Sequence, residues 1–272
     1  MMITELDKEE FSRCRKLLHP EGQLEAAAVI EGASAGRVFA DDRLAPTTGL
    51  IWLGNNDGFI FIGDENNENF NGALNAFIDR VIKTEAMKVQ LEWFEAIGNH
   101  DEWNKTMEKA FARRELGSWK QRVYKLKPGS YSDDFDDSDE EGYETIRIKK
   151  EHFEKGKNKF LQDKISLYWP APDTFLKEGI GYASIHKDEI ISVCFSGFVV
   201  GNVHGIDIET LKPHQGKKLA QSLARKFVQE CLQKEIIAYW DCMEMNKPSI
   251  AVAERLGFTH VSTYTGFEFP LK

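Results

Sequence analysis

Cysteine is scarce in this sequence. Its 272 residues include only four, at Cys14, Cys194, Cys231 and Cys242. None stands in a C-x-x-C pair, the spacing typical of structural zinc sites, and two of them lie among apolar residues. The pattern therefore predicts buried, reduced thiols and no metal site. The G-x-S-x-G, H-E-x-x-H and P-loop motifs are also missing, which argues against the hydrolases, metalloproteases and nucleotide-binding proteins that carry them.

Long apolar runs are missing too. The longest, over residues 190–200, is interrupted by Ser192, Ser196 and Gly197, and it is too short to span a bilayer. The first eleven residues are acidic and hold no apolar segment of the kind found in signal peptides. We therefore expect a cytoplasmic protein that does not bind membranes.

No excess of positive charge is present. The net charge is −9, and residues 132–144 hold eight acidic residues and no basic one. Outside that run, 36 acidic residues face 35 basic ones, so nothing indicates a nucleic-acid-binding protein. A like-charge run this dense is typical of a solvated segment, and we predict an acidic loop or linker over 131–144. The hydrophobic content of 42% is enough for a sizeable core, in one large domain or two smaller ones.

The most informative stretch is residues 203–220. Alternating apolar and polar residues predict a strand over 203–211, and Pro213 ends it because proline has no N–H for a sheet ladder. Gly216 supplies a turn, and the period then becomes helical over 216–233. Free N–H groups at the start of that helix, together with Lys217 and Lys218, predict a cradle for a pyrophosphate. The simpler alternative is an ordinary passage from strand to helix.

The remaining pattern predicts an α/β fold with a mixed, largely antiparallel sheet flanked by helices. Helices are expected at 5–18, 23–31, 68–83, 101–115, 149–162, 173–178 and 248–256. Strands are expected at 36–41, 50–53, 59–62, 88–94, 119–126, 181–186, 189–200, 236–242 and 258–269, with residues 55–58 as a hairpin turn. The strands at 203–211 and 236–242 should be parallel, because a helix connects them, and a splay between them would open a cleft.

A second motif follows the 236–242 strand. Asn246 can cap a helix through its side chain, and Pro248 suits the first helical turn. Gly257 suits a left-handed C-terminal cap, and Phe258 begins the returning strand. This local account explains the motif without any function.

The order and spacing of the two motifs resemble the GCN5-related N-acetyltransferase (GNAT) superfamily. Its acetyl-CoA loop, Q/R-x-x-G-x-G/A, is similar to residues 215–220, and its later N-x-x-S/A…G-F element is similar to Asn246, Ser249, Gly257 and Phe258. More narrowly, the D-I-E-T at 207–210 and the W-D-C at 240–242 resemble a bacterial subfamily that includes zwittermicin A resistance acetyltransferases.

The resemblance implies an acetyl-CoA-binding GNAT domain over 145–272 and an N-terminal α/β subdomain over 1–130. Acetyl-CoA is the implied cosubstrate, and its pantetheine arm would lie along a strand edge. The residues implied to bind it are Glu209, Thr210, Leu211, Gln215, Gly216, Lys217, Lys218, Leu219, Ala220, Asn246 and Ser249. The N-terminal subdomain could wall the acceptor pocket with Trp52, Phe59, Phe61 and Trp93.

Two positions depart from the family pattern. Lys218 stands where the family usually has glycine, so its side chain could crowd the phosphates. Ala253 stands where many GNAT enzymes carry the tyrosine that protonates the leaving thiolate. That role, if it is filled, must come from elsewhere.

Acetyl transfer to an amine requires a group that removes a proton. Asp207 and Glu209 share one face of their strand, since they are two residues apart, and we prefer Glu209 as the base because it lies nearer the loop. Asp241 is an alternative base, and Tyr264 is a candidate acid. The alternative for the carboxylates is that they are solvated and take no part in catalysis. The alternative for Tyr264 is an ordinary place in the core or on the surface.

The function expected from the resemblance is transfer of an acetyl group from acetyl-CoA to a primary amine of a small molecule. A GNAT-like module that binds CoA or a partner without catalysis is the alternative, and a structural α/β protein is the third. The departures at Lys218 and Ala253 favour the second, whereas the carboxylates favour the first. A homodimer is a candidate oligomeric state that no pattern in the sequence supports.

Overall fold

The chain forms two compact units, each with its own hydrophobic core. A computed structural model describes residues 3–127, 129–132, 141–154 and 158–271. Unit 1 comprises Met1–Gln121 and Thr263–Lys272, and unit 2 comprises Arg122–Ser262. The chain passes from unit 1 to unit 2 within β6 (Gly117–Leu126) and returns within β12 (Phe258–Pro270). Most of the predicted acidic linker lies outside the described residues.

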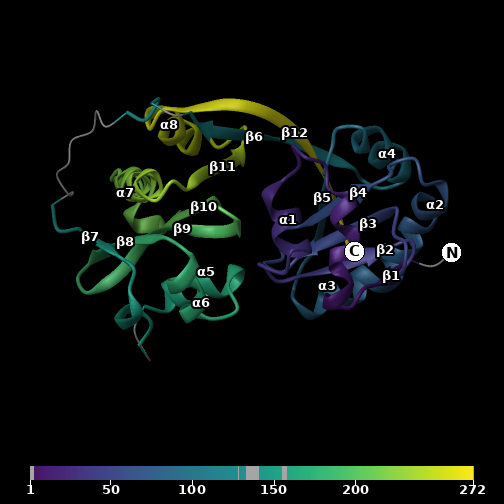
Figure 1. The fold of residues 1–272 in the computed structure, drawn as a ribbon, viewed down its shortest axis with the longest axis horizontal. Helices are drawn as coiled ribbons and strands as arrows, with labels where there is room; N and C mark the ends of the chain where they lie inside the picture. Colours follow the sequence, from purple (N-terminus) through teal and green to yellow (C-terminus); the bar gives the residue numbers. More distant parts are fainter. Residues whose placement is uncertain (1–2, 128, 133–140, 155–157, 272) are drawn as a thin grey trace. The chain divides into compact units, whose positions relative to one another are not determined.

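Unit 1 is built on a sheet with the strand order β1-β2-β3-β4-β5-β12 (Figure 1). Its strands besides β12 are β1 (Thr4–Glu5), β2 (Gly36–Ala40), β3 (Thr48–Leu53), β4 (Phe59–Gly63) and β5 (Trp93–Gly98). Its neighbours pair antiparallel except β4 and β5, which pair parallel. The predicted hairpin is confirmed, because β3 and β4 pair from Thr48 opposite Gly63 to Trp52 opposite Phe59.

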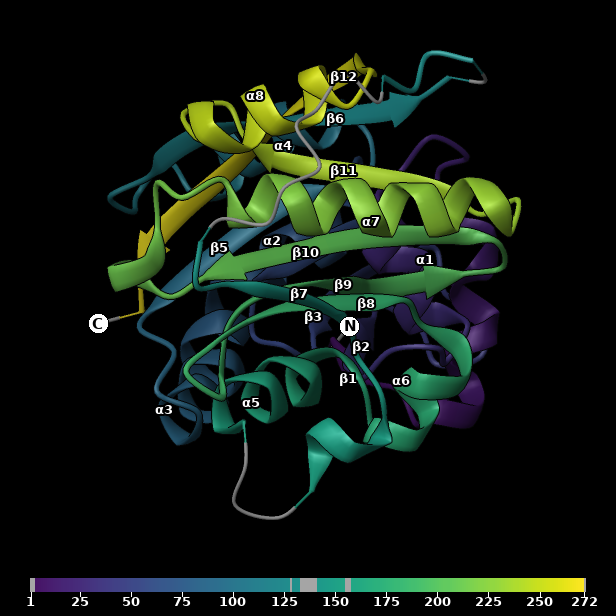
Figure 2. The ribbon, with the colours of Figure 1, turned by 90° about the vertical axis from the view of Figure 1, so that its left-hand side faces the viewer.

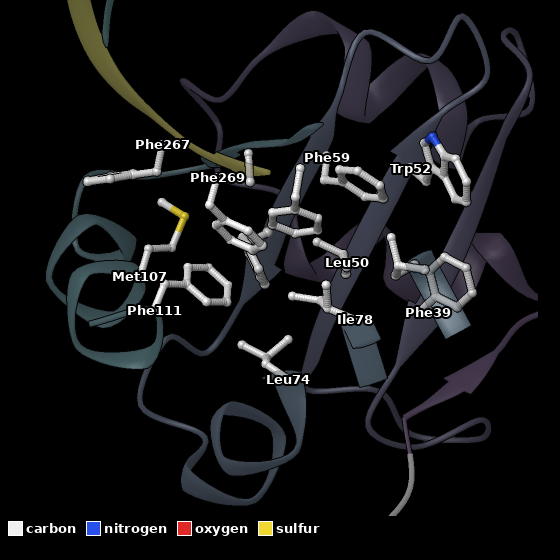
Figure 3. Close-up of a cluster of buried hydrophobic side chains, with 14 of the residues drawn as sticks. Phe39, Leu50, Trp52, Phe59, Leu74, Ile78, Met107, Phe111, Phe267 and Phe269 are labelled. Atoms are coloured by element: carbon white, nitrogen blue, oxygen red, sulfur yellow. The ribbon is translucent and has the colours of Figure 1, made fainter. Parts of the chain in front are cut away.

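Aromatic side chains fill the core of unit 1 (Figure 3). The ring of Phe94 stacks on Phe59 at 4.4 Å and on Phe269 at 4.9 Å between ring centroids. Phe269 comes from β12, so the last residues of the chain complete this core. The helices of unit 1 are η1 (Lys8–Leu17), α1 (Leu24–Ile30), α2 (Glu68–Phe77), the π-helical η2 (Ile78–Ile82), α3 (Lys83–Lys88) and α4 (Trp103–Ala110). The helix expected over 5–18 is the 3-10 helix η1.

Three of the four aromatic residues considered for an acceptor pocket are core residues instead. Trp52, Phe59 and Phe61 are at most 4% exposed and pack within unit 1. Trp93 is 44% exposed, so it alone of the four presents much surface.

The strand predicted over 88–94 is wrong. Helix α3 continues to Lys88, and β5 begins only at Trp93. Between them Gln90 has a left-handed φ of 58°, and the N–H of Leu91 donates back to the C=O of Ala86 at 3.0 Å. Helix α3 thus ends with a left-handed glutamine where a glycine is usual. Because that glycine is missing, the sequence did not indicate that a helix ends there.

Unit 2 has the strand order β12-β6-β11-β10-β9-β8-β7. Its strands besides β6 and β12 are β7 (Glu144–Arg147), β8 (Gly181–His186), β9 (Glu189–Val200), β10 (Val203–Thr210) and β11 (Ile237–Met243). Its helices are η3 (Lys150–Phe153), α5 (Lys159–Tyr168), α6 (Pro172–Glu178), η4 (Lys212–His214), α7 (Leu219–Gln233) and α8 (Lys247–Arg255). The predicted mixed, largely antiparallel α/β fold is confirmed.

Helices α5 and α7 cover opposite faces of the unit 2 sheet. On β9, Cys194 packs with residues of α7, whereas its neighbours Val193 and Phe195 pack with residues of α5. Successive strand residues point to opposite faces, so the two helices lie on opposite sides. Figure 2 shows α7 in front of the sheet, running along β10 and β11. The helix predicted over 149–162 is wrong in its bounds, because Asn158, with φ 52°, precedes α5, and a left-handed residue cannot continue a right-handed helix.

His204 makes the stability of unit 2 depend on pH. Its side chain is 4% exposed, and its Nδ1 lies 2.8 Å from the hydroxyl of Ser196. Burial lowers the pKa of His204 to about 4. The histidine of the unfolded chain has a pKa of about 6.5. Between about pH 6.5 and 4, the unfolded chain therefore binds a proton at this residue and the folded chain does not.

We expect the free energy of unfolding to fall as the pH drops through about 6.5 towards 4. The loss from this group between pH 7.5 and 5 is about 2 kcal/mol. Urea unfolding of the wild type and His204→Gln at both pH values measures it. Equal pH dependence in the two proteins would contradict this assignment.

Candidate functional site

Strands β10 and β11 separate part-way along their length. They pair parallel from Val203 opposite Ile237 to Gly205 opposite Tyr239, and within the described residues this ladder goes no further. Beyond it β10 continues to Thr210, paired with β9 only, after a register shift between His204 and Ile206. The predicted parallel arrangement is confirmed, and the strands part after three residue pairs (Figure 2).

The backbone of β10 presents polar groups where β11 has separated from it. The N–H of Leu211 donates to the C=O of Ile191 at 2.9 Å, on the β9 side. Because strand groups alternate in direction, the backbone groups of Ile208 and Thr210 point to the other side. The C=O of Thr210 accepts a hydrogen bond there from the side chain of Gln215 at 3.0 Å. An extended ligand with amide groups could pair with this edge.

The turn after β10 leads directly into helix α7. Gly216 has φ 80°, and a Cβ placed on it would meet no atom within 4 Å, so the backbone there is open. The first helical hydrogen bond runs from the N–H of Ser222 to the C=O of Lys218 at 3.0 Å. The N–H groups of Leu219 and Ala220 therefore have no acceptor within the helix. These donors and the dipole of a 15-residue helix favour an anion.

Lys218 adopts the conformation for which the family's glycine is suited. It precedes α7 with φ 59° and ψ 9°. A residue with a Cβ is strained there, and a β-branched residue more so. The turn before α7 thus places a lysine in the left-handed conformation for which glycine is suited.

We expect Lys218→Gly to raise the free energy of unfolding by about 0.5 kcal/mol and Lys218→Val to lower it by about 1–2 kcal/mol. Urea unfolding measures both values. Lys217→Val is the matched control, because Lys217 is not among the described residues with positive φ. A similar effect at both lysines would count against backbone strain at Lys218.

The second motif forms the helix start that its sequence indicates. The side chain of Asn246 accepts a hydrogen bond from the N–H of Ser249 at 3.2 Å, which caps α8. The hydroxyl of Ser249 accepts from Nε1 of Trp240 at 3.0 Å. Gly257, with φ 91°, ends this segment as predicted. Whether Asn246 and Ser249 also contact a cofactor stays a prediction.

The two carboxylates of β10 meet helix α5. Asp207 accepts a 2.6 Å hydrogen bond from the hydroxyl of Tyr168, and Glu209 forms an ion pair with Lys164. Both partners lie four residues apart on α5, so the predicted common face of Asp207 and Glu209 is confirmed. Burial raises the pKa of Asp207. The sequence analysis missed Tyr168 and Lys164, although their helical spacing matches the strand spacing of the carboxylates.

The other predicted catalytic residues lie elsewhere. Asp241, on β11, accepts a hydrogen bond from the hydroxyl of Tyr239 at 3.4 Å. Tyr264 belongs to the part of β12 assigned to unit 1. Ala253 is fully buried in the core under α7 and α8. The catalytic roles of Asp241 and Tyr264 stay predictions.

An aromatic and imidazole cluster borders the turn before α7. The hydroxyl of Tyr143 lies 2.9 Å from Nδ1 of His214, and its ring stacks on His186 at 4.6 Å. Nζ of Lys217 lies 5.6 Å from the centre of the Tyr143 ring. The sequence analysis missed Tyr143 and His186, because they come from distant segments and leave no local signal near this turn.

The described residues contain neither a cluster of metal-binding side chains nor a helix that could span a membrane. None of these residues forms a group of three or more histidine, cysteine or acidic side chains that could hold a metal ion. In the same part of the chain, no helix combines the length and apolar character needed to cross a membrane.

A separated parallel strand pair, with a polar turn leading into a long helix, is the arrangement expected for an acyl-CoA-binding transferase of the GNAT type. The GNAT acetyltransferase family model matches residues 15–267, so the chain belongs to this family. It is 25% identical to the uncharacterized N-acetyltransferase YdfB of Bacillus subtilis (strain 168), over 97% of each chain.

Solved structures share the fold. A GCN5-related N-acetyltransferase-like protein from Streptococcus suis aligns with a TM-score of 0.67 at 18% identity, over 96% of this chain and 98% of the other. A tandem GNAT protein from the clavulanic acid biosynthesis pathway aligns with a TM-score of 0.58 at 12% identity, over 99% of both chains. The family membership and the relative together identify an acyltransferase.

Proposed function

We propose that this protein transfers an acetyl group from acetyl-CoA to a primary amine of a small molecule. The observation that carries the proposal is the free edge of β10 beyond the end of the β10–β11 ladder at Gly205 and Tyr239, together with the open turn that follows this strand and precedes α7. The free edge of β10 offers backbone groups to an extended, amide-containing arm. The turn before α7 offers N–H donors to a pyrophosphate. Acetyl-CoA contains both of these chemical features.

The residues present fit acetyl-CoA. The backbone edge at Ile208 and Thr210 would hold its pantetheine arm, and the N–H groups from Gly216 to Ala220 would hold its phosphates. When bound, acetyl-CoA supplies an acyl group activated as a thioester. The open space around Gly216 supports this fit, because a side chain there would stand in the path of an approaching phosphate.

The identity of the acceptor amine and the subfamily to which the protein belongs are also proposals. The carboxylates of Asp207 and Glu209 suit a cationic amine that is drawn to negative charge. We further propose kinship with the zwittermicin A resistance acetyltransferases, supported by the segments 207–210 and 240–242. The cytoplasmic location and the homodimer stay predictions.

Thermal unfolding with acetyl-CoA tests the cosubstrate, with NAD and ATP as controls. A ligand at 100 times its Kd stabilises the folded state by about 2.7 kcal/mol, which corresponds to about 5 °C for a chain of this size. We expect that shift with acetyl-CoA and none with the controls. An unchanged Tm would defeat acetyl-CoA binding.

Turnover is then followed as release of free thiol, with putrescine, lysine, glucosamine and kanamycin as acceptor amines. We expect at least one of them to accelerate thiol release and to appear as an acetyl amide by mass spectrometry. Stabilisation by acetyl-CoA without acetylation of any amine would favour a module that binds CoA without catalysis.

A further inference from the structure

In the Tyr168–Asp207 pair, only one of the two carboxylate oxygens of Asp207 has a hydrogen-bond donor within the described part of the chain, and the stability of the fold does not explain this. The hydroxyl of Tyr168 donates to Oδ2 of Asp207 at 2.6 Å. The second carboxylate oxygen, Oδ1, is buried and has no hydrogen-bond partner among the residues that the structure describes. A buried acceptor without a donor lowers stability, so such a group calls for an explanation, and a catalytic role is one.

Packing fixes the position of the Tyr168 ring. It meets Phe195 and Phe198 edge to face, with centroids 5.5 and 5.3 Å away. Gly197 lies between these phenylalanines in sequence, and a Cβ there would come within 3.2 Å of two ring atoms of Tyr168. The glycine thus lets the ring lie against β9, where its hydroxyl reaches Asp207.

The charges around Asp207 distinguish it from Glu209. Asp207 is faced by Tyr168 and Lys164 from α5, by Glu209 on its own strand and by Cys194 on β9. Lys164 forms its ion pair with Glu209, whose side chain is 41% exposed. Asp207 has a phenol as its closest partner instead of a cation. Its raised pKa makes it a stronger proton acceptor than an ordinary aspartate.

We propose that Tyr168 relays a proton from the acceptor amine to Asp207. This inference rests on the proposed acetyl transfer and adds to it the route of the proton. Oδ1 of Asp207 is closed off from solvent, so a substrate does not reach the carboxylate directly there. Tyr168 is only half-buried, and its oxygen can accept a proton while its own proton moves along the 2.6 Å hydrogen bond to Oδ2.

The amine nitrogen attacks the thioester carbonyl carbon, a C–N bond forms and the C–S bond breaks. The sulfur leaves with the bonding electron pair as a thiolate. The proton lost by the nitrogen moves to the oxygen of Tyr168, whose former proton moves to Asp207. The proton on Asp207 then returns through the hydroxyl of Tyr168 and solvent to the thiolate, which gives the amide and the free thiol.

The test compares Tyr168→Phe with Tyr182→Phe, using the amine of the four-member panel that is acetylated fastest. Tyr182 is a matched control because its hydroxyl also donates to a carboxylate, Glu230, at 2.8 Å in the same unit. We expect kcat/KM to fall about 100-fold in Tyr168→Phe, with loss of the acidic limb of the pH profile, and to stay within about threefold in Tyr182→Phe. The Kd for acetyl-CoA should stay unchanged in both. Equal activity of the two variants, or an unaltered pH profile, would overturn the relay.

A second measurement needs no turnover. In protein labelled with ¹³C in the aspartate carboxyl groups, the NMR signal of Asp207 is assigned by its loss in Asp207→Asn. We expect Tyr168→Phe to raise the pKa of Asp207, because the hydrogen bond from the phenol favours the ionised form. An unshifted titration would overturn the pairing even if no amine were acetylated. Acetylation by the wild type together with full activity of Tyr168→Phe would defeat the relay and leave the proposed function standing.

Discussion

Replacing Arg147 with methionine should lower the free energy of unfolding by about 3 kcal/mol. Nε and Nη2 of Arg147 bind the two carboxylate oxygens of Glu230 at 2.7 and 2.9 Å. The hydroxyl of Tyr182 and Nζ of Lys234 donate to the same carboxylate at 2.8 and 2.7 Å. The Glu230 side chain is 13% exposed, so removal of Arg147 leaves a largely buried charge with weakened compensation. Losing one partner of a buried pair costs about 3–5 kcal/mol, and partial exposure places this pair at the lower end.

The hydrogen bonds to Glu230 also predict that the free energy of unfolding falls as the pH is lowered. Burial alone would raise the pKa of Glu230, but the hydrogen bonds from Arg147, Lys234 and Tyr182 lower it to about 2. Its contribution to stability is therefore complete above the unfolded pKa of about 4.5 and is lost as the pH falls towards 2. Arg147→Met should be less sensitive to pH in this window than the wild type.

Urea unfolding at pH 7, 4 and 3 measures both effects. Arg122→Met is the matched control, because Arg122 pairs with Glu244 at 2.6 Å while the two side chains are 31% and 38% exposed. An exposed pair of this kind contributes about 0–1 kcal/mol. Equal losses in the two variants would show that burial does not set the strength of the Arg147 pair.

Replacing Ala220 with glutamate should weaken acetyl-CoA binding about 30-fold. Ala220 lies in the first turn of α7, where we propose that backbone N–H groups hold the phosphates. A carboxylate about 8 Å from a phosphate repels it by about 2 kcal/mol at the dielectric of a protein surface. The same carboxylate interacts favourably with the helix dipole, so the free energy of unfolding should not fall. Loss of binding without loss of stability separates this effect from misfolding.

Calorimetric titration with acetyl-CoA measures the Kd. Gln229→Glu is the control, because it makes the same change of net charge in the same helix but far from its first turn. We expect it to alter the Kd by less than about threefold, since charges beyond a Debye length are largely screened. The same loss in both variants would attribute the effect to net charge and would remove the helix start from the binding site.

Sequence reasoning was strongest where a local pattern determines the structure. The strand ending at Thr210, the turn at Gly216 and the cap at Asn246 are each decided by a few neighbouring residues, and all three are present. It failed at Gln90 and Asn158, because left-handed residues other than glycine carry no distinctive signal. It also missed the Tyr168–Asp207 pair, whose members are 39 residues apart, because only the packing of α5 on the sheet brings them together. The family motif therefore identified the turn, whereas the environment of the carboxylates required the structure.

The path of β12 has a consequence for how the protein is made. Unit 1 contains both ends of the chain, and its core needs Phe267 and Phe269 from the last residues. During synthesis, all of residues 122–262 leave the ribosome before these two phenylalanines do. The usual order, in which the N-terminal domain folds first, is thus reversed, and unit 2 can be complete while unit 1 still lacks its final strand. A stop codon a few residues early would damage the N-terminal half of the protein.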